Sequence, residues 1–404
     1  MDTIDGILKG LNNEEKLVFD LIQKKGPISK SELILITGIK LSTLNRLMEP
    51  LENAKLILEI GTGESSGGRK PALYDVSRVT GYVIGIDISR TYTQVIVSNL
   101  KAEILCKVQF PMDESCTPEI TFTKTAEAVK SCMLSIGISL NECIGAGIGT
   151  VGPLDREKGV ILCPENFPAP GWKDVPVKEL LQKELGLPVF IDNGANAAAL
   201  AEYLFGDGSN FKSLAYFNCG IGIRTGVISS GVIVRTVNST EDAFAHIVID
   251  VDGESCSCGN YGCIECYCSI HSILKKFRAE VKKGRYSVIT KPVEEISYID
   301  ICKAAEGNDS LSREVLAGAA MIFAAGLANY INMLNPGMVV LSGPLVTNSN
   351  FFYDVCQEVA VKKIYMKESN RTVFSKGGFF GDNAIAIGAA AMVVEYYLGS
   401  RVLE

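Results

Sequence analysis

Candidate strands and helices alternate along the chain from Gly81 to the C-terminus, and this alternation limits the fold more than any other feature. Strand patterns rich in β-branched residues occur at 83–88, 94–99, 146–149, 189–191, 214–217, 226–233 and 338–341. Long helical stretches separate them, at 121–135, 195–204, 310–334 and 384–398. The pattern predicts an α/β fold. Two strand-rich halves, which begin near Gly81 and Leu214, each contain a Gly-rich hairpin and indicate a duplicated architecture.

The first 80 residues follow a different pattern, in which short helices come first. Residues 14–25 place apolar side chains at helical spacing and stop before a Gly-Pro pair. Ser29 is followed three residues later by Glu32, the arrangement of a capping box. This predicts a second helix over residues 30–37.

A third predicted helix, residues 43–54, carries the side chains that we expect to meet DNA. Gly38 makes the tight turn before it, and Ser42 is expected to be its N-cap. The second and third helices together predict a helix-turn-helix, in which the start of the later helix enters the major groove. Polar residues near that start can reach base edges or phosphates; they are Ser42, Thr43, Asn45 and Arg46.

A Gly- and Ser-rich loop with a basic end lies between two predicted strands, 57–60 and 72–76. A flexible linker is the alternative interpretation, because Gly/Ser runs usually form linkers. The strands that close the loop on both sides favour a wing. In a wing, Arg69 and Lys70 would enter a minor groove or clamp phosphates.

The distribution of charge neither proves nor excludes nucleic-acid binding. The net charge is −7. Residues 1–80 contain eleven Lys/Arg and eleven Asp/Glu, so the whole acidic excess lies after residue 80. Binding to DNA needs only a local basic face.

Other features of the composition predict a cytoplasmic protein. We find no apolar run of the roughly 18–20 residues that a membrane span needs, and no signal-peptide core at the N-terminus. The 13 cysteines are an odd number, and most stand alone in apolar stretches, which argues against a secreted disulfide framework. Single cysteines such as Cys132, Cys219 and Cys302 are expected to be buried thiols that pack as small apolar residues.

One histidine and three cysteines form the clearest local motif; they are His246, Cys256, Cys258 and Cys263. They supply a complete tetrahedral ligand set, and the glycines of the Cys-x-Cys-Gly-x-x-Gly-Cys run let the loop fold tightly. Because four protein ligands leave no open position, the expected Zn²⁺ is structural. The alternative is a group of buried free cysteines. Cys266 and Cys268 are spare thiols that could compete as ligands.

The segment from Cys256 to Glu265, Cys-x-Cys-Gly-x-x-Gly-Cys-x-Glu, resembles the signature of the ROK family of repressors, open reading frames and sugar kinases. Segments 145–155, 166–172 and 334–343 resemble other parts of that family's pattern. The amino-terminal region, which ends in Ser-Gly-Gly-Arg-Lys-Pro, is similar to the winged helix of ROK repressors and is absent from plain ROK kinases. The resemblance implies two actin-like, hexokinase-like lobes of the ribonuclease H-like ATPase type, with a sugar cleft between them.

We therefore expect three parts. A winged helix-turn-helix DNA-binding domain spans residues 1–78, and the first α/β lobe spans 79–195. The second lobe spans 196–404 and includes the zinc motif. Its C-terminal helix is expected to pack back on the first lobe.

The chain departs from the ROK kinases at the positions that carry phosphotransfer. The kinases have Glu/Asp-Asn-Asp-Ala-Asn, in which the second acidic residue is the general base, whereas this chain has Gly194 there. Loss of a general base costs about 10²–10⁴ in rate. Glycines of both phosphate loops are also replaced: the first loop is Asp-Ile-Ser-Arg-Thr at 87–91, and the second carries Arg224. We therefore expect no enzyme and assign no catalytic residue.

The sugar-contacting positions of the family are only partly kept. The resemblance assigns sugar contacts to five residues of this chain: Asn166, Asp192, Asn193, His246 and Glu265. Ala243 stands where the kinases have a glutamate. The expected effector is a modified, phosphorylated or different sugar, unless sugar binding has been lost.

Two functions from different classes follow. The favoured one is a DNA-binding transcriptional regulator, a repressor of carbohydrate-metabolism genes that binds operator DNA as a homodimer or dimer of dimers and responds to a carbohydrate effector. The other is an active ATP-dependent sugar kinase with a DNA-binding head, which Gly194 disfavours. A constitutive regulator, or one controlled by a protein partner such as a sugar-transport component, is a third alternative.

Overall fold

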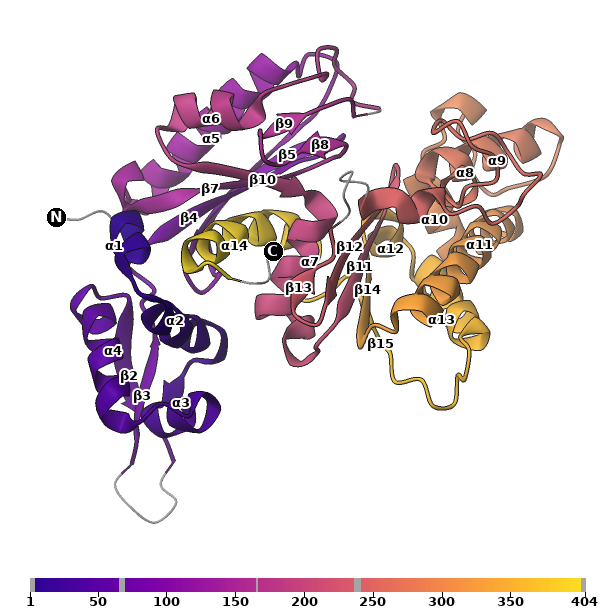
Figure 1. The fold of residues 1–404 in the computed structure, drawn as a ribbon. Helices are drawn as coiled ribbons and strands as arrows, with labels where there is room; N and C mark the ends of the chain where they lie inside the picture. Colours follow the sequence, from indigo (N-terminus) through magenta and orange to yellow (C-terminus); the bar gives the residue numbers. More distant parts are fainter. Residues whose placement is uncertain (1–3, 65–69, 165, 236–240, 401–404) are drawn as a thin grey trace. The chain divides into compact units, whose positions relative to one another are not determined.

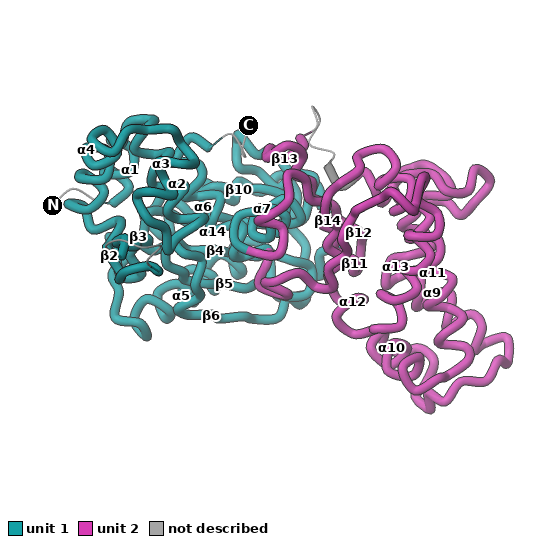
Figure 2. The backbone as a smooth tube through the Cα atoms, turned by 90° about the horizontal axis from the view of Figure 1, so that it is seen from below, with its two compact units in different colours: residues 1–205, 385–404 teal, residues 206–384 magenta. Residues whose placement is uncertain are grey.

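The computed structural model describes residues 4–64, 70–164, 166–235 and 241–400. By its contacts the chain forms two compact units, residues 1–205 with 385–404 and residues 206–384 (Figure 2). The chain therefore leaves the first unit once and returns to it for its last helix.

The amino-terminal part of the first unit is a winged helix, which we call the head (Figure 1). Its elements are α1 (Ile4–Gly10), α2 (Asn13–Lys25), β1 (Ile28–Ser29), α3 (Lys30–Thr37), α4 (Leu41–Asn53), β2 (Ile57–Thr62) and β3 (Ala72–Val76). The strands form an antiparallel sheet in the order β1-β3-β2. β2 and β3 are the two strands that the sequence predicts around the wing.

Local hydrogen bonds explain where the helices of the head begin and end. The Ser29 side chain accepts from Glu32 N, and Glu32 Oε2 accepts from Ser29 N at 2.8 Å, which confirms the predicted capping box of α3. Gly38 ends that helix with φ 72°, a left-handed conformation that glycine adopts without strain. Asn12 and Glu15 form a second capping box at α2.

The predicted start of the third helix is wrong. α4 begins at Leu41, and Lys40 is its N-cap residue, without a side-chain hydrogen bond. Leu44 N donates to Lys40 O at 2.9 Å, so Ser42 already lies inside the first turn and does not cap the helix. Helix α1 was not predicted from the sequence; its Leu8 is buried in the core of the first unit.

The rest of the first unit is an α/β lobe. Its elements are β4 (Tyr82–Ile88), β5 (Tyr92–Asn99), β6 (Ile104–Pro111), α5 (Pro118–Ile136), η1 (Leu140–Glu142), β7 (Cys143–Thr150), β8 (Leu154–Asp155), β9 (Val160–Ile161), α6 (Val177–Leu185), β10 (Val189–Asn193), α7 (Gly194–Phe205) and α14 (Ala384–Leu398). Its five-stranded sheet has the order β10-β7-β4-β5-β6. β4, β5 and β6 form an antiparallel meander, and β7 and β10 add to it in parallel.

The second unit repeats this plan. Its elements are η2 (Asp207–Asn210), β11 (Leu214–Cys219), β12 (Ile223–Ser229), β13 (Val232–Ile233), η3 (Glu241–His246), α8 (Glu265–Cys268), α9 (Ile270–Lys282), η4 (Val293–Glu295), α10 (Tyr298–Glu306), α11 (Ser310–Leu334), β14 (Met338–Ser342), α12 (Pro344–Asn348), α13 (Asn350–Lys363), β15 (Val373–Lys376) and η5 (Gly381–Asn383). The sheet order is β13-β12-β11-β14-β15, again an antiparallel meander followed by two parallel strands. The duplicated α/β architecture predicted from the sequence is confirmed.

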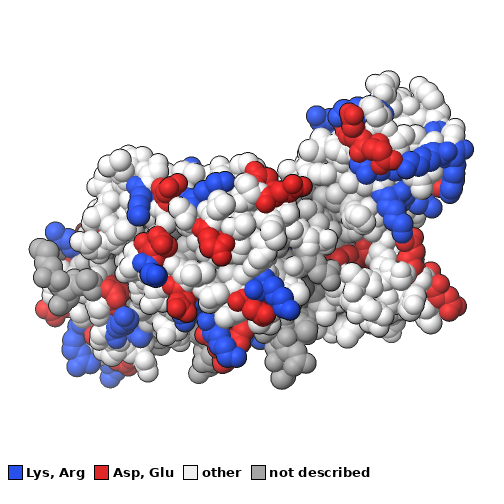
Figure 3. Space-filling view, turned by 90° about the horizontal axis from the view of Figure 1, so that it is seen from above, with Lys and Arg blue, Asp and Glu red and all other residues white. Residues whose placement is uncertain are grey.

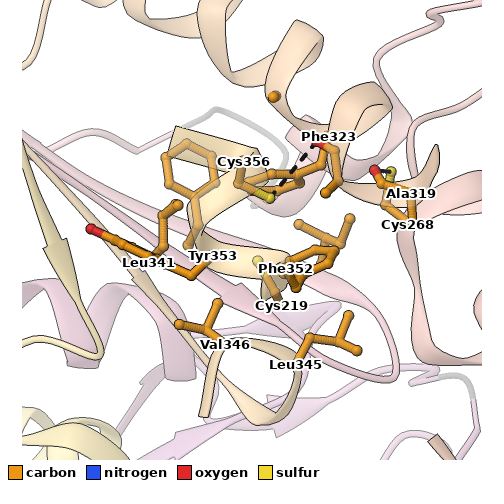
Figure 4. Packing of buried hydrophobic residues seen from close by; sticks show 14 of the residues in the cluster. Cys219, Cys268, Ala319, Phe323, Leu341, Leu345, Val346, Phe352, Tyr353 and Cys356 are labelled. Atoms are coloured by element: carbon orange, nitrogen blue, oxygen red, sulfur yellow. Dashed lines mark hydrogen bonds between the residues drawn. The ribbon is translucent and has the colours of Figure 1, made fainter. Parts of the chain in front are cut away.

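Helix α11 forms the centre of the second unit's core. Over one 18-residue window its mean hydropathy is 1.5, so by length and composition alone it could cross a membrane, and the expectation that no such run exists is wrong. More than half of that window is buried inside the unit. Phe323 packs there with Phe352 and with the thiols of Cys219, Cys268 and Cys356 (Figure 4). This packing accounts for the apolar sequence of the helix.

The cysteines outside the motif divide into two kinds. Cys132, expected to be a free thiol, is paired with Cys106 in a disulfide between α5 and β6, with their Cα atoms 5.5 Å apart. Cys219 and Cys302 are buried free thiols, as predicted. Burial raises the pKa of Cys302 to about 12, so this thiol stays protonated and packs as an apolar group.

The contact boundary between the units differs from the predicted boundary between the lobes. It lies after Phe205, at the end of α7, whereas the sequence placed it after residue 195. The reason is that α7 is one uninterrupted helix, which packs on the sheet of the first lobe.

Candidate functional site

Helix α4 has one face in the core of the head and one face free of it. The buried residues are Leu44, Leu47, Met48 and Leu51. Of the predicted DNA contacts, Ser42, Asn45 and Arg46 are exposed and Thr43 is half-buried. Lys30 of α3 donates from Nζ to Asn45 Oδ1 at 2.9 Å, so a further cation, which the sequence reasoning missed, lies beside this face. The helix therefore presents the predicted polar residues together.

The base of the predicted wing is a closed antiparallel hairpin. Thr62 pairs with Ala72, and Gly63 N donates to Pro71 O at 2.8 Å just beyond the strand ends. Lys70 is exposed at this base. Arg69 lies outside the described residues. On the face drawn in Figure 3, basic and acidic side chains lie in mixed groups with uncharged surface between them.

The four residues of the Cys/His motif come together in the second unit, and their ligand atoms all lie within 4.8 Å of one another. Cys256 Sγ lies 3.6 Å from His246 Nδ1, and Cys258 Sγ lies 3.7 Å from Cys263 Sγ. This Cys₃His cluster could hold a metal ion. Burial raises the pKa of Cys256, but hydrogen bonds from Cys258 and His246 lower it by more, to about 7. The pKa of Cys263 is raised to about 12 by burial and by the neighbouring thiols.

Two glycines let the loop bring these thiols together. Gly262 has φ 67°, and a Cβ atom there would collide with the carbonyl of Asp250. Gly259 has φ 93°, within a turn closed by the bond from Cys256 N to Asn260 O. The loop can thus fold tightly only with glycine at these positions.

The two spare thiols lie in different places. Cys266 lies beside the cluster and contacts Ser255 O at 3.7 Å, and burial together with its neighbour Cys256 raises its pKa to about 11. Cys268 points into the hydrophobic core, where its Sγ lies 3.1 Å from Ala319 O (Figure 4). Only Cys266 is placed to compete as a ligand.

Asp192 and Asn193, two predicted sugar contacts, end β10 in the first unit and are almost fully buried. Asn193 Oδ1 accepts from Ala195 N at 2.8 Å, which starts α7. Asp192 Oδ1 accepts from Asn193 N and from Asn196 Nδ2. Gly194, which stands where the resemblance predicts the general base of the ROK kinases, is the first residue of α7.

A third predicted contact in the first unit, Asn166, is exposed with φ 63°. The next residue, Phe167, stacks on Trp172 with ring centroids 4.4 Å apart. Trp172 is buried and donates from Nε1 to Cys116 O at 3.0 Å. The aromatic pair thus fixes the segment that carries Asn166, a role that the sequence reasoning did not assign to it.

The two remaining predicted sugar contacts lie in the second unit. His246 ends η3, and Glu265 begins α8. Glu265 Oε2 accepts from Ile223 N at 3.2 Å, at the start of β12 and next to the turn at 220–222. Ala243, which replaces a glutamate of the kinases, is exposed. Each unit therefore carries some of the five predicted sugar contacts.

The β4–β5 turn, where the ROK kinases have their first phosphate loop, is closed by its own side chain. Ser89 Oγ donates to Tyr92 O at 2.9 Å and accepts from Tyr92 N at 3.2 Å and from Thr91 N at 3.4 Å. A phosphate loop instead offers free backbone amides to its ligand. In this turn the backbone amides of Thr91 and Tyr92 already donate to Ser89 Oγ.

A cavity of about 600 Å³ in the second unit is separate from all these residues. It is bounded by the end of α11, the segment before β14 and residues 365–372, and contains none of the predicted site residues. It lies at the amino ends of β14 and β15, whereas α/β sheets bind ligands at the carboxyl ends of their strands.

The fold and these sites define a winged-helix protein built on a duplicated α/β body. The sequence pattern of the ROK family matches residues 83–396, and the chain belongs to the ROK family. The chain is 30% identical to the xylose repressor of Bacillus spizizenii over 384 residues, 95% of each chain. It is 29% identical to the glucokinase of Halalkalibacterium halodurans over 266 residues, 65% of this chain and 80% of the kinase. A crystal structure of a ROK family transcriptional regulator, a homologue of the E. coli MLC protein, matches with a TM-score of 0.78 and 22% identity, over 97% of this chain and 98% of the regulator.

Proposed function

We propose that this protein is a transcriptional repressor of carbohydrate-metabolism genes that binds operator DNA and releases it in response to a carbohydrate. The observation that carries the proposal is a winged helix with an exposed polar face on α4, built onto a ROK body. The similarity to the Bacillus repressor extends through the head, because it covers 95% of both chains. The similarity to the glucokinase covers only 65% of this chain.

The α4 face and the wing are the proposed DNA contacts. Residues from the first turns of α4 would enter the major groove: Ser42, Thr43, Asn45 and Arg46. Arg69 and Lys70 would bind phosphates or the minor groove from the wing. A homodimer, or a dimer of dimers, would place two heads on the half-sites of an inverted repeat in the cytoplasm.

The same body is proposed to have no phosphotransfer activity. Gly194 has no side chain to take a proton from a sugar hydroxyl. Ser89 occupies amides of the first phosphate turn, and Arg224 puts a long side chain where the kinases have a glycine. Three changes at the reacting groups support a binding role.

Zinc is the proposed metal of the Cys₃His cluster. With Zn–S near 2.3 Å and Zn–N near 2.05 Å, tetrahedral geometry puts two sulfurs about 3.8 Å apart and a nitrogen and a sulfur about 3.6 Å apart. The spacings of 3.7 Å and 3.6 Å fit these values. Four protein ligands would hold the ion in a structural role.

A sugar or sugar derivative is the proposed effector, and D-xylose is the first candidate because of the name of the Bacillus relative. The residues proposed to contact it are Asn166, Asp192, Asn193, His246 and Glu265. His246 would use one ring nitrogen for zinc and the other for the sugar.

The proposal is tested by fluorescence anisotropy with labelled DNA from upstream of this protein's own gene and of neighbouring sugar genes. We expect a preference for one of these sequences over shuffled DNA, and an affinity that falls with salt with a log–log slope of about −0.9 per neutralised phosphate. A screen of D-xylose, D-glucose, N-acetylglucosamine and their phosphates by thermal shift identifies the effector, since a ligand at about 100 times its Kd adds about 2.7 kcal/mol of stability. Binding to all sequences with equal affinity would contradict the proposal.

A further inference from the structure

Helix α14 is packed against the first lobe more closely than side chains would permit. A Cβ atom at Gly85 of β4 would collide with the carbonyl of Ala386, and one at Gly147 of β7 would collide with the carbonyl of Ala389. Backbone therefore lies on backbone along this face of the helix. Such contacts leave no room for α14 to shift without moving the sheet.

The first turn of α14 meets the segment that we propose to contact sugar. A Cβ atom at Gly149 would lie 2.5 Å from Ile385 Cγ2 of α14 and 3.4 Å from Gly194 Cα of α7. One turn later, a Cβ atom at Gly388 would collide with the carbonyl of Ala197 on α7. The two helices thus touch directly after Asp192 and Asn193.

The last turns of α14 meet the DNA-binding head. Val393, Val394, Tyr397 and Leu398 belong to the same hydrophobic cluster as the core of the head. Lys24 of α2 lies with its Nζ 3.4 Å from Glu395 Oε2 and 2.5 Å from Asp20 Oδ1. Because ten residues separate Ile385 from Glu395, the two contacts lie about 15 Å apart along one rigid helix.

The ion pair between Lys24 and Glu395 is largely buried. Separating its two charges would therefore cost free energy. Glu395 is 1% exposed and Lys24 has a side-chain exposure of 21%. Burial raises the pKa of Glu395, and the attraction of Lys24 lowers it in part. Loss of the Glu395 carboxylate removes one of the two carboxylates that pair with Lys24, and breaking a buried pair is destabilising. The ion pair therefore favours one position of the head on α14.

Further contacts between the head and the lobe favour the same position of the head. Gln23 is buried and donates from Nε2 to Leu100 O at 2.6 Å. Lys101 lies 2.8 Å from Asp75 and also donates to the carbonyls of Gln23 and Gly26. The head is thus fixed to the lobe through polar groups on both sides of α2.

We propose that α14 connects the segment at Asp192–Asn193 to the DNA-binding head. A change at that segment would act through α14 and alter how the head packs on the lobe. Its regulatory meaning rests on the function proposed above. A shift of α7 on ligand binding moves α14 together with the sheet on which it lies. This movement in turn changes the contact between Glu395 and Lys24. The proposed DNA-binding arrangement is the one described here, in which the head contacts the last turns of α14.

Two variants of the full-length protein test this element from opposite ends. Gly388→Ala forces α14 away from α7, and Glu395→Gln removes the charge at the head while keeping the shape of the side chain. The controls are Gly318→Ala, a helical glycine with open space around it, and Glu358→Gln, a glutamate in an exposed pair with Lys362. Each variant is examined by amide hydrogen exchange of residues 18–26 and by operator affinity.

We expect both test variants to speed exchange in residues 18–26 and to raise the operator Kd by roughly 5-fold or more, the lower end of allosteric coupling. The salt slope should not change, because the phosphate contacts on α4 are intact. Neither control should change exchange or affinity. Unchanged exchange and affinity in Glu395→Gln, a nearly isosteric change that leaves the fold in place, would overturn the proposal even where Gly388→Ala fails to fold. If the wild type binds no DNA selectively, the proposed function fails, and hydrogen exchange still decides whether α14 fixes the head.

Discussion

Replacement of one thiol of the Cys₃His cluster gives the most direct measure of what the metal does. Cys258 is exposed, so Cys258→Ser alters no core packing and acts only through the ligand set. Cys163 is an exposed free cysteine outside the cluster, so Cys163→Ser is a matched control. The comparison isolates the loss of a ligand from the general effect of changing sulfur to oxygen.

The structure indicates that loss of the metal ligand will lower the free energy of unfolding by a large amount. The loop that carries the ligands is held in part by isolated bridges, Val248 to Cys263 and Ser255 to Tyr261, and not by a regular ladder. Loss of a bound metal belongs to the few mechanisms that cost about 4 kcal/mol or more. For a domain of the size of residues 206–384, a loss of that size lowers the Tm by roughly 8–16 °C at 2–4 °C per kcal/mol.

The assay combines differential scanning fluorimetry with metal analysis of protein purified without added zinc. Wild type and Cys163→Ser should contain one zinc per chain and melt together, whereas Cys258→Ser should lose the metal and melt earlier. The reasoning is refuted by a metal-free wild type of full stability, or by a Cys258→Ser protein that melts with the control.

Three further predictions follow from the head and the body. Arg46→Ala should weaken operator binding by about 1–3 kcal/mol where it contacts a base, and Lys25→Ala, an exposed cation outside α4, should not; anisotropy titrations check this. Ser29→Ala should lower the free energy of unfolding by about 0.5–2 kcal/mol, measured in urea. Hydrogen bonds from the backbone and side chain of Ser29 lower the pKa of Glu32. The ionised Glu32 therefore stabilises the fold above pH 4.5, and this stabilisation is lost as the pH falls through the lowered pKa. Ser29→Ala should weaken this pH dependence of stability. ATP should phosphorylate no common hexose or pentose in a coupled assay, and Gly194→Asp should not restore activity.

Features with local causes could be predicted from the sequence. The capping box of Ser29 and Glu32 involves residues three apart, and the Cys/His motif carries its glycines within itself, so both were found correctly. The start of α4 was missed although it is local, because Ser42 has the residue type of an N-cap but Lys40 O accepts the first helical bond. Residue type alone thus overstates how well a helix start is fixed.

Contacts between particular residues that lie far apart in the chain could not be predicted. The disulfide joins Cys106 and Cys132, which face each other only because α5 packs on β6. The ion pair between Lys24 and Glu395 spans 371 residues of sequence. Gly147 appears in the sequence as one glycine among many, and only the structure shows that backbone of α14 lies against it. Such contacts are set by tertiary packing and leave no periodic signal.

Polar side chains in the β4–β5 turn and at the start of α7 hydrogen-bond to nearby backbone. Ser89 takes the amides of its own turn, and Asn193 caps the start of α7. These bonds stabilise the two segments, since a buried donor or acceptor without a partner is costly. On α4, by contrast, Asn45 and Arg46 are exposed, and Asn45 Oδ1 accepts a hydrogen bond from Lys30. This contrast supports the proposal that the head binds a ligand and that the body does not transfer phosphate.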